Sequence, residues 1–317
     1  MWLPLLALLG VILLYRWYRQ SQILENLTDK HVFITGCDTG FGNLLARNLD
    51  KRGMRVLAAC LTDRRAEELR KETSSRLQTV ILDVTDSQSV SSAANWVSTI
   101  VGDKGLWGLV NNAGISVPIC TNEWLKKEDF LKVLNVNLLG VIDVTLNLLP
   151  LIRKAKGRIV NVASIAGRLT ICPGGYSISK YGVESFSDSL RQEMRPFNVK
   201  VCILEPGYFS TQIATGELLQ GDMKRNWERL TEEVKQIYGE EYYKKGLASV
   251  DGLEQRCSKK LSLVTDCMEH ALTAVHPWTR YSAGWDAKLF FIPLSYLPTV
   301  ISDFLLTIGQ PKPAWTG

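Results

Sequence analysis

The sequence lacks the cysteine and histidine patterns that are typical of disulfide-bonded or metal-binding domains. Its seven cysteines form an odd set without a C-x-x-C pair, and its three histidines do not gather around such a pair. We therefore expect reduced thiols that act as small apolar residues within the fold, and no metal site. The residues concerned are Cys37, Cys60, Cys120, Cys172, Cys202, Cys257, Cys267, His31, His270 and His276.

A strong excess of charge of one sign is also missing. The chain has 37 basic and 32 acidic residues, and the net charge of +5 is spread along the sequence. This distribution argues against a nucleic-acid partner. The 46% of hydrophobic residues argues against disorder, and 317 residues allow one large α/β domain or two smaller ones. No G-x-S-x-G motif occurs, which excludes the nucleophile elbow of the α/β-hydrolases.

The amino-terminal segment differs in composition from the rest of the chain. It is apolar from Trp2 to Tyr15 and then alternates arginine with tryptophan and tyrosine. A membrane helix needs about 20 apolar residues, and these aromatic residues extend the run to the interface. A cleaved signal peptide is the alternative, but it would have a basic start and a small-residue cleavage site. We expect an uncleaved membrane anchor over residues 1–18 and a linker over residues 19–29.

Basic residues flank this segment on its carboxyl side, at Arg16, Arg19 and Lys30. Under the positive-inside tendency they place the following domain in the cytosol, which agrees with the odd number of cysteines. A glycosylation sequon at residues 26–28 would matter only if that side were luminal.

From residue 30 onward, short apolar runs rich in β-branched residues alternate with longer amphipathic stretches. This pattern predicts one α/β domain over residues 30–288, with a doubly wound parallel sheet and helices on both faces. Strands that are buried on both faces explain why the runs are almost continuously apolar. The expected strands are 31–36, 55–60, 77–84, 106–114, 157–164, 200–207 and a seventh around 281–285.

Two regions depart from this alternation. Residues 212–260 are charged and helical in pattern, and a substrate lid over the carboxyl ends of the strands is one interpretation. Residues 289–317 form an apolar tail that Pro293 and Pro298 interrupt. The tail is interpreted as core, as a wall of the substrate site or as a membrane-dipping segment, and the prolines argue against a second span.

A glycine-rich turn follows the first expected strand. Residues 35–42 read TGCDTGFG, with glycines at positions 36, 40 and 42. Glycine permits a tight turn and lets the backbone approach a pyrophosphate at the amino end of the next helix. Because the spacing differs from the G-x-G-x-x-G fingerprint, a purely structural corner is the alternative. The position in the first strand–helix unit favours a nucleotide site.

A tyrosine and a lysine lie four positions apart in the segment GGYSISKYG, as Tyr176 and Lys180. A tyrosine with a pKa of about 10 is a poor base at neutral pH. A cation at position i+4 shares its helix face and would lower that pKa, which predicts that Tyr176 accepts a proton beside Lys180. A chance contact on a helix surface is the alternative, because composition alone would produce about one such spacing.

Taken in order, these segments resemble the motifs of the short-chain dehydrogenase/reductases. The resemblance covers about residues 30–285 and implies a seven-stranded Rossmann fold. The interval from Ser164 to Tyr176 is one residue shorter than is common in the family. The matching motifs are Thr35-Gly36-x-x-x-Gly40-x-Gly42, Asn111-Asn112-Ala113-Gly114, Asn137, Ser164, Tyr176-x-x-x-Lys180, and Pro206-Gly207 with Thr211.

The resemblance implies a catalytic set of Ser164, Asn137, Tyr176 and Lys180. Tyr176 would accept the hydroxyl proton of an alcohol, and Ser164 would bind the substrate oxygen by a hydrogen bond. Lys180 would also bind the nicotinamide ribose. Asn137 would hold a water that links Lys180 to solvent, and a structural cap is its alternative role.

The resemblance also implies how the cofactor is held. Asp83 would accept a hydrogen bond from the adenine amino group or, alternatively, cap the following helix. Asn112 and Gly114 would shape the floor under the adenosine ribose, and Thr211 would reach the nicotinamide carboxamide. The expected cofactor-binding residues are Gly36, Asp38, Gly40, Phe41, Gly42, Thr62, Asp83, Asn112, Ala113, Gly114, Tyr176, Lys180, Pro206, Gly207 and Thr211.

The end of the second strand usually separates NAD from NADP, through a carboxylate or an arginine respectively. Here cysteine and leucine stand at that place. Asp38 and Asp63 would repel a 2′-phosphate, whereas Arg64 and Arg65 would attract it. We expect NAD as the cofactor, with NADP as the alternative.

Within the family, the chain resembles the membrane-bound retinol dehydrogenases and the related microsomal 3α- and 17β-hydroxysteroid dehydrogenases. Segments such as FITGCDTGFGNLLAR and TRYSAGWDAKLFFIPLSYLP support this. The resemblance implies oxidation of a retinol or a hydroxysteroid (androgen) at the endoplasmic reticulum membrane, without choosing between the two. It also allows a homodimer through the helices that contain Lys132 and Tyr176. The alternatives are an NADPH-dependent retinal or ketosteroid reductase and a non-catalytic, membrane-tethered nucleotide-binding protein.

Overall fold

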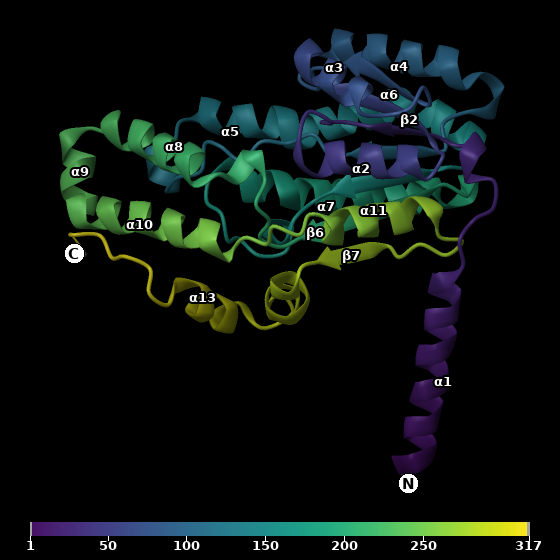
Figure 1. Ribbon diagram of the computed structural model, residues 1–317. Coiled ribbons are helices and arrows are strands. Elements are labelled where there is room, and N and C mark those ends of the chain that lie inside the picture. Colours follow the sequence, from purple (N-terminus) through teal and green to yellow (C-terminus); the bar gives the residue numbers. More distant parts are fainter. Residues whose placement is uncertain (1, 316–317) are drawn as a thin grey trace.

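Seven parallel strands form the sheet at the centre of the computed structural model, which describes residues 2–315 (Figure 1). The strand order is β3-β2-β1-β4-β5-β6-β7, which confirms the expected doubly wound sheet. The order reverses between β1 and β4, and folds of this class bind their ligands at such a point. The strands are β1 (His31–Ile34), β2 (Arg55–Cys60), β3 (Leu77–Ile81), β4 (Gly108–Asn111), β5 (Arg158–Val162), β6 (Lys200–Pro206) and β7 (Arg280–Ala283).

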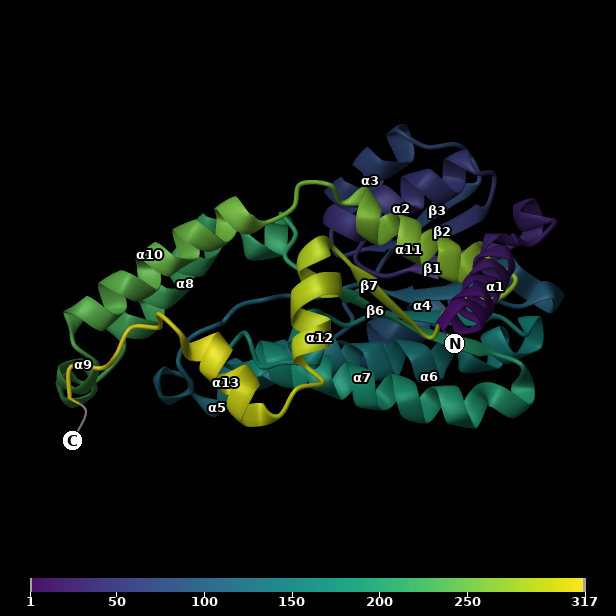
Figure 2. The same cartoon turned by 90° about the horizontal axis from the view of Figure 1, so that it is seen from below.

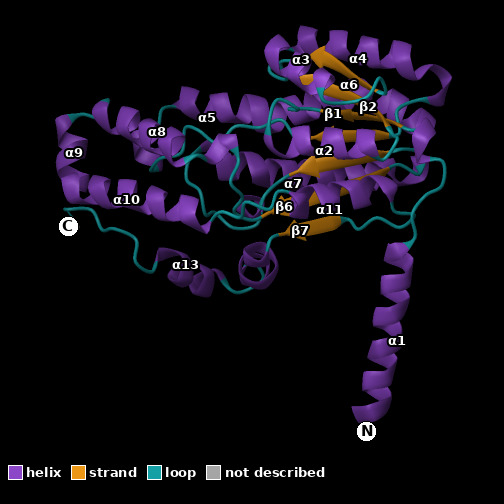
Figure 3. Cartoon of the chain, in the orientation of Figure 1, coloured by secondary structure: helices purple, strands orange, loops and turns teal. Residues whose placement is uncertain are grey.

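Helices cover both faces of this sheet (Figure 3). Strand residues alternate between two cores: Val32 and Ile34 of β1 belong to one, and Phe33 belongs to the other. Because both faces are buried, the strands are apolar at nearly every position, as the sequence led us to expect. The first core is completed by α2 (Gly40–Lys51), α3 (Asp63–Lys71) and α11 (Ser262–Thr273), and the second by α4 (Ser87–Val101), α6 (Gly140–Ala155) and α7 (Gly175–Met194).

One long helix runs from α5 (Lys127–Leu134) through a π-helical turn at Asn135–Leu139 into α6. By length and composition, this helix could cross a membrane. Its apolar side packs against the sheet, where Val144, Leu148 and Ile152 are buried. It is therefore a core helix of the domain.

Helix α1 (Trp2–Ser21) stands away from the domain and includes the expected anchor from residue 2 onward (Figure 1). The residues that follow it are paired with the end of α11 and the chain just after it. The N–H of Leu24 donates to the carbonyl of Thr273, and the N–H of Val275 donates to that of Gln22, both at 2.8 Å. The expected linker thus fastens α1 to the domain.

The charged region after β6 is helical, as expected, and extends beyond the carboxyl ends of the strands (Figure 1). An aromatic cluster attaches it to the rest of the domain. The ring of Trp124 lies 5.1 Å from that of Trp227 and 5.3 Å from that of Tyr238, between centroids. The helices of this region are α8 (Gly216–Glu228), α9 (Glu232–Tyr238) and α10 (Glu240–Arg256).

The carboxyl-terminal tail lies on the side of the domain from which α1 emerges (Figure 2). It contains a π-helical turn at Ala287–Phe291, α12 (Ile292–Leu294) and α13 (Thr299–Thr307). The tail therefore begins slightly before the expected residue 289. Residue 1 of the expected anchor and residues 316–317 of the expected tail lie outside the described residues.

Candidate active site

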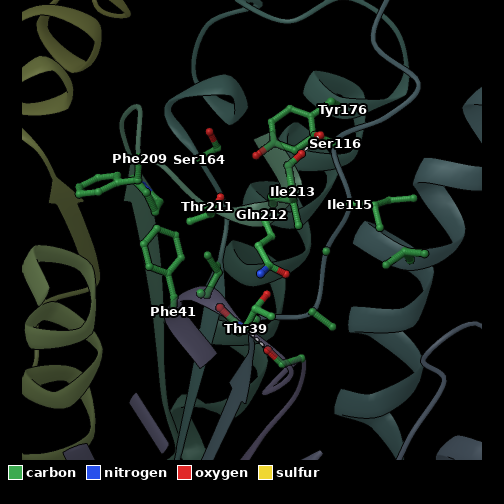
Figure 4. A pocket seen from close by; sticks show the side chains of 18 of the residues that line it. Thr39, Phe41, Ile115, Ser116, Ser164, Tyr176, Phe209, Thr211, Gln212 and Ile213 are labelled. Atoms are coloured by element: carbon green, nitrogen blue, oxygen red, sulfur yellow. Dashed lines mark hydrogen bonds between the residues drawn. The ribbon is translucent and has the colours of Figure 1, made fainter. Parts of the chain in front are cut away.

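A cavity of about 500 Å³ lies at the carboxyl ends of the central strands (Figure 4). Most of the residues expected from the sequence line this cavity. Gly42 and Asn137 are not among the lining residues, but each contacts a residue of the wall. The expected residues that line it are Gly36, Asp38, Gly40, Phe41, Thr62, Asp83, Asn112, Ala113, Gly114, Ser164, Tyr176, Lys180, Pro206, Gly207 and Thr211.

The glycine loop leaves no room for side chains at two of its three glycines. A Cβ on Gly36 would lie 2.8 Å from the Cα of Ala113, and φ at Gly36 is +69°. A Cβ on Gly42 would lie 2.4 Å from the carbonyl oxygen of Gly36. The backbone of this turn is thus open to the cavity just where α2 begins. This arrangement fits a pyrophosphate, which binds to backbone N–H groups at a helix amino end.

Asp38 in the glycine loop lies across the end of β2. Its carboxylate accepts the N–H of Leu61 at 2.9 and 3.1 Å and the N–H of Thr62 at 3.2 Å. A carboxylate therefore stands beside the end of the second strand, although β2 itself does not supply one. Dinucleotide folds use an acidic group at this place to bind the adenosine ribose.

The two arginines that follow β2 are engaged on helix α3. Arg64 pairs with Glu68 at 2.9 Å, and Arg65 pairs with the same carboxylate at 2.8 Å. The Arg64 side chain is 82% exposed, so it points away from the cavity into solvent. Arg65 lines the cavity and is the one of the two that a 2′-phosphate could reach.

Asn112 joins the ends of β1 and β4 beneath the glycine loop. Its side-chain amide donates to the carbonyl oxygens of Thr35 and Gly36 at 3.0 and 3.1 Å. Its backbone N–H donates to the hydroxyl of Thr35 at 3.0 Å. The asparagine thereby holds the loop and the floor of the cavity in one fixed arrangement.

Asp83 lines the cavity at the end of β3 but does not cap the following helix. Its carboxylate accepts the N–H and the hydroxyl of Thr85 at 2.9 and 2.7 Å, a local turn. Helix α4 is capped by Asp86, which accepts the N–H of Gln88 at 2.9 Å. The alternative role of Asp83 as a helix cap is wrong, because Asp86 stands directly before the helix.

The phenol of Tyr176 points toward the hydroxyl of Ser164 inside the cavity (Figure 4). Ser164 lies two residues after the end of β5. Its hydroxyl accepts the N–H of Ala166 at 3.1 Å, which fixes the side chain. Burial raises the pKa of Tyr176 above its ordinary value, Cys172 adds to the rise, and a hydrogen bond with Ser164 opposes it. The prediction that this pKa lies below its ordinary value is therefore wrong for the protein without a cofactor.

Lys180 is buried one helical turn beyond Tyr176. Its ammonium lies 5.7 Å from the centre of the Tyr176 ring and donates to the carbonyl of Val162 at 2.9 Å. Burial lowers the pKa of Lys180 to about 8. The end of β5 thus holds the cation near the phenol.

Asn137 lies in the π-helical turn between α5 and α6 and is completely buried. Its side-chain oxygen accepts the N–H of Ile115, and its amide donates to the carbonyl of the same residue, both at 2.9 Å. It also donates to the hydroxyl of Ser179 at 3.2 Å. π-Turns are frequent at functional sites. Here the turn holds the chain that leaves β4 next to α7, the helix that contains Lys180.

The sequence did not reveal the apolar wall of the cavity. Most of these residues lie outside the longer helices and the strands, where no periodic pattern marks them, although Leu219 lies in α8. For Ile115 and Phe209, a position just after an expected strand was the available signal. The hydroxyl of Ser116 donates to the carbonyl of Ile213, which joins two parts of this wall. The wall includes Ile115, Ile119, Ile171, Phe209, Ile213 and Leu219.

The region interpreted as a lid contacts the cavity mainly near its two ends. Gln212, Ile213 and Leu219 line the cavity at one end, and Cys257 lines it at the other. Among the described residues, none of α9 lines it. The middle of the region instead projects away from the sheet (Figure 1).

The described side chains contain no group of three or more His, Cys, Asp or Glu residues that is placed to hold a metal ion. Among the described residues, none of the seven cysteines forms a disulfide, and none of them is exposed. The cavity therefore offers hydroxyl, amide, ammonium and carboxylate groups to a ligand.

Comparison with known proteins gives this site a context. Residues 30–220 match the family model described as short chain dehydrogenase. The chain is 61% identical to retinol dehydrogenase 7 of Rattus norvegicus over 99% of both chains. It is 57% identical to the human 17-beta-hydroxysteroid dehydrogenase type 6, again over 99% of both chains.

Solved structures show the same fold. A short-chain dehydrogenase from Streptomyces avermitilis superposes with a TM-score of 0.69 at 23% identity, covering 88% of this chain and 96% of that one. A 3-ketoacyl-(acyl-carrier-protein) reductase from Brucella melitensis, complexed with NADH, has a TM-score of 0.54 at 28% identity. That match covers 58% of this chain and 78% of the other.

Proposed function

The chain belongs to the short-chain dehydrogenase family, and we propose that it transfers a hydride between NAD and the hydroxyl-bearing carbon of a lipophilic alcohol. It is an oxidoreductase of the alcohol dehydrogenase type that uses a nicotinamide cofactor. The observation that carries the proposal is that Ser164, Tyr176 and Lys180 line one cavity with an apolar wall. A non-catalytic nucleotide-binding protein would have no use for these three groups together.

The phenol of Tyr176 is the proton acceptor in this proposal. A bound nicotinamide supplies the hydride acceptor. Tyr176 takes the hydroxyl proton, and the Ser164 hydroxyl donates a hydrogen bond to the substrate oxygen on which negative charge develops. Since burial raises the pKa of Tyr176 in the protein alone, the phenolate needs positive charge nearby when it forms. Lys180 has a pKa of about 8 and is mostly protonated at neutral pH, so it is suited to supply that charge.

Asn137 acts as a positioning residue for Lys180 in this scheme. A Cβ on Gly114 would lie 3.3 Å from the Asn137 side-chain oxygen and 3.9 Å from the Lys180 nitrogen. The two side chains therefore approach the same point of the chain after β4. A water held there would connect the lysine with solvent.

NAD is the proposed cofactor because of the charges around the end of β2. The Asp38 carboxylate stands where the adenosine ribose would bind, and a 2′-phosphate beside it would be repelled. The alternative is NADPH-dependent reduction of retinal or of a ketosteroid. One observation favours it, namely that Arg65 lines the cavity within reach of that ribose.

The proposed substrates are a retinol, a 3α- or 17β-hydroxysteroid, or both. The apolar wall of the cavity suits a hydrophobic alcohol better than a sugar or a small acid. One close relative is named for retinol and another for a 17-beta-hydroxysteroid. These two names leave both substrate classes in the proposal.

We further propose that α1 anchors the enzyme in the endoplasmic reticulum membrane, with the catalytic domain in the cytosol. The helix stands clear of the domain, and its apolar side chains are open to the surroundings: Leu6 and Val11 are each 63% exposed. Such a surface is costly in water and favourable in lipid. Arg16 and Arg19, at the end of the helix near the domain, support the cytosolic orientation.

A homodimer is proposed through the face formed by α5, α6 and α7. Helix α7 packs beside the long helix formed by α5 and α6. Leu139, Leu146 and Ile178 on these two helices are each more than half exposed. Lys132 lies on the exposed side of the same helix. Burying these side chains against a second copy would remove apolar surface from water.

Microsomes that contain the full chain provide the test. We expect turnover of all-trans-retinol or of a 3α-hydroxysteroid with NAD, and a lower kcat/KM with NADP. Turnover of neither class with either cofactor, by protein that binds NADH, would contradict the proposed function. Protease protection of the carboxyl terminus would contradict the cytosolic orientation.

A further inference from the structure

We infer that an exposed apolar face on the carboxyl-terminal tail is a second membrane contact, which lies in the bilayer surface beside α1 and turns one wall of the cavity toward the lipid. This inference rests on the proposed anchoring by α1. We call this surface the tail face. It consists of Trp285, Leu289, Phe290, Tyr296, Leu297, Val300, Ile301, Phe304, Leu305 and Ile308, all of which are exposed.

Helix α13 turns Ser302 toward the domain and a row of large apolar side chains outward, while its polar residues Asp303 and Thr307 are exposed as well. Ser302 is only 5% exposed, whereas Val300 is 80% exposed and Phe304 is 66% exposed. Val300, Phe304 and Ile308 follow one another at four-residue intervals, so they form a stripe along one side of the helix. A helix of a water-soluble domain has the opposite arrangement. The outward row of Val300, Phe304 and Ile308 therefore indicates an apolar medium beside this part of the helix.

The composition of the tail face matches a membrane interface. Trp285 and Tyr296 are 74% and 72% exposed, and these two residue types are enriched at the level of the lipid headgroups. Asp286 turns inward, because its carboxylate accepts the N–H of Tyr208 at 2.7 Å. Lys288 is exposed, and a lysine at this depth can reach the headgroups with its ammonium.

The position of the tail face selects the bilayer as its occupant. Figure 1 shows α13 on the side of the domain from which α1 extends. In Figure 2, which looks at that side from below, α1, α12 and α13 are all in front of the domain, and α12 lies between α13 and α1. If α1 enters a membrane, the tail face meets the surface of the same membrane. A second protein on this face would have to share it with the lipid.

The tail face is linked to the wall of the cavity through Phe291, whose ring lies 5.0 Å from that of Phe290. The ring of Phe291 lies 5.6 Å from the ring of Tyr208, and Tyr208 lines the cavity. On the other side, the Arg168 guanidinium lies 5.1 Å from the centre of the Tyr296 ring. Arg168 directly follows the turn that begins at Ser164. In this proposal, a lipophilic alcohol dissolved in the bilayer enters the cavity past Phe291 and Tyr208.

The test places a probe on the tail face of the full chain in phosphatidylcholine vesicles. Phe304→Cys and Ser92→Cys are each labelled with an environment-sensitive fluorophore, and the unsubstituted chain is labelled as the blank. Ser92 is exposed on α4, on the opposite side of the domain, and is the matched control (Figure 1). Lipids that carry a nitroxide are then added to the vesicles to quench the probe.

We expect strong quenching and a blue-shifted emission at position 304, and neither effect at position 92. Equal, weak quenching at both positions would overturn the inference, as would cross-linking of position 304 to a second copy without quenching. Recovery of the protein with washed vesicles reports on α1 separately, and neither measurement depends on turnover.

A second variant tests the consequence for substrate delivery. Val300→Glu combined with Phe304→Glu should raise the KM for retinol presented in vesicles several-fold. The kcat/KM for a short, water-soluble alcohol should stay unchanged, because neither side chain lines the cavity. An unchanged KM for retinol in vesicles would contradict the proposed path from the bilayer.

Discussion

The carboxylate of Asp38 accepts the backbone N–H of Leu61 at 2.9 Å, so a residue of the glycine loop reaches the end of the second strand. The loop and the strand are separated by more than a whole helix in the sequence, and the sheet brings them together. This contact puts a negative charge where the ribose of a dinucleotide would bind.

Replacing this carboxylate should change the choice of cofactor. In Asp38→Ala, the repulsion of a 2′-phosphate is lost, and we expect the ratio of kcat/KM for NAD to that for NADP to fall by about tenfold or more. Steady-state kinetics with both cofactors measure the ratio. Asp63→Ala is the control, because Asp63 does not line the cavity. An unchanged ratio in Asp38→Ala would show that the carboxylate does not select the cofactor.

The glycine loop should not tolerate a methyl group at position 42. In Gly42→Ala the new Cβ would lie 2.4 Å from the Gly36 carbonyl oxygen and 2.5 Å from the Asn112 amide nitrogen. We expect the Kd for NADH, measured by fluorescence titration, to rise by about tenfold or more, since each tenfold costs about 1.4 kcal/mol. In the control Gly221→Ala, the nearest atom to the new Cβ is 3.4 Å away, and NADH binding should be normal. Normal NADH binding by Gly42→Ala would show that the loop does not need a glycine at this position.

Asn137→Ala should lower both stability and activity. The substitution leaves the N–H and the carbonyl of Ile115 without their partner inside the protein, which should cost about 1–3 kcal/mol of unfolding free energy. Chemical denaturation in detergent measures this loss. Asn147→Ala is matched, because Asn147 lies on the exposed side of α6 and bonds to Asp143. A loss of kcat in the variant with an unaltered KM would indicate that the lysine, rather than substrate binding, is disturbed.

A buried carboxyl should make the stability depend on pH. Burial, together with Glu205, raises the pKa of Glu184 from 4.5 to about 7, although Arg280 opposes the rise. Between these two values the folded protein holds a proton that the unfolded chain releases, so this carboxyl lowers the stability as pH rises from about 4.5 to 7. Glu184→Gln removes this effect, and its stability relative to the unsubstituted chain should increase by up to about 3 kcal/mol over that window.

Denaturation at pH 5 and at pH 7.5 measures how the free energy of unfolding changes with pH in Glu184→Gln and in the unsubstituted chain. Glu193→Gln, on the exposed side of the same helix, should leave the pH dependence unchanged. Parallel slopes for Glu184→Gln and the unsubstituted chain would mean that this carboxyl is already ionised in the folded protein at pH 5.

The parts of the fold that follow from local pattern were predictable. Val32, Phe33 and Ile34 are buried on both sides of β1, so the run is apolar throughout and indicates a central parallel strand. The glycines at 36 and 42 are required by contacts that lie close in the sequence or at the end of the neighbouring strand. For this reason the loop could be placed from its spacing.

Contacts between distant segments were not predictable. The hydrogen bond from the N–H of Leu24 to the carbonyl of Thr273 joins the two ends of the domain. No sequence pattern in either segment predicts that the two segments pair. The π-helical turn at Asn135–Leu139 changes the helix by one residue, and it contains no glycine or proline of its own to mark it. The pKa of Tyr176 depends on how deeply the fold buries the phenol, which helical spacing does not report.

Turnover by Tyr176→Phe is the most direct measurement of the proposed mechanism. The variant keeps the ring and removes only the hydroxyl group, so it should fold and still bind NADH. If the phenol of Tyr176 accepts the proton of the alcohol, its kcat for retinol or a hydroxysteroid should fall by about a hundredfold or more. A variant that folds, binds NADH and turns over either alcohol at the rate of the unsubstituted enzyme would contradict the mechanism.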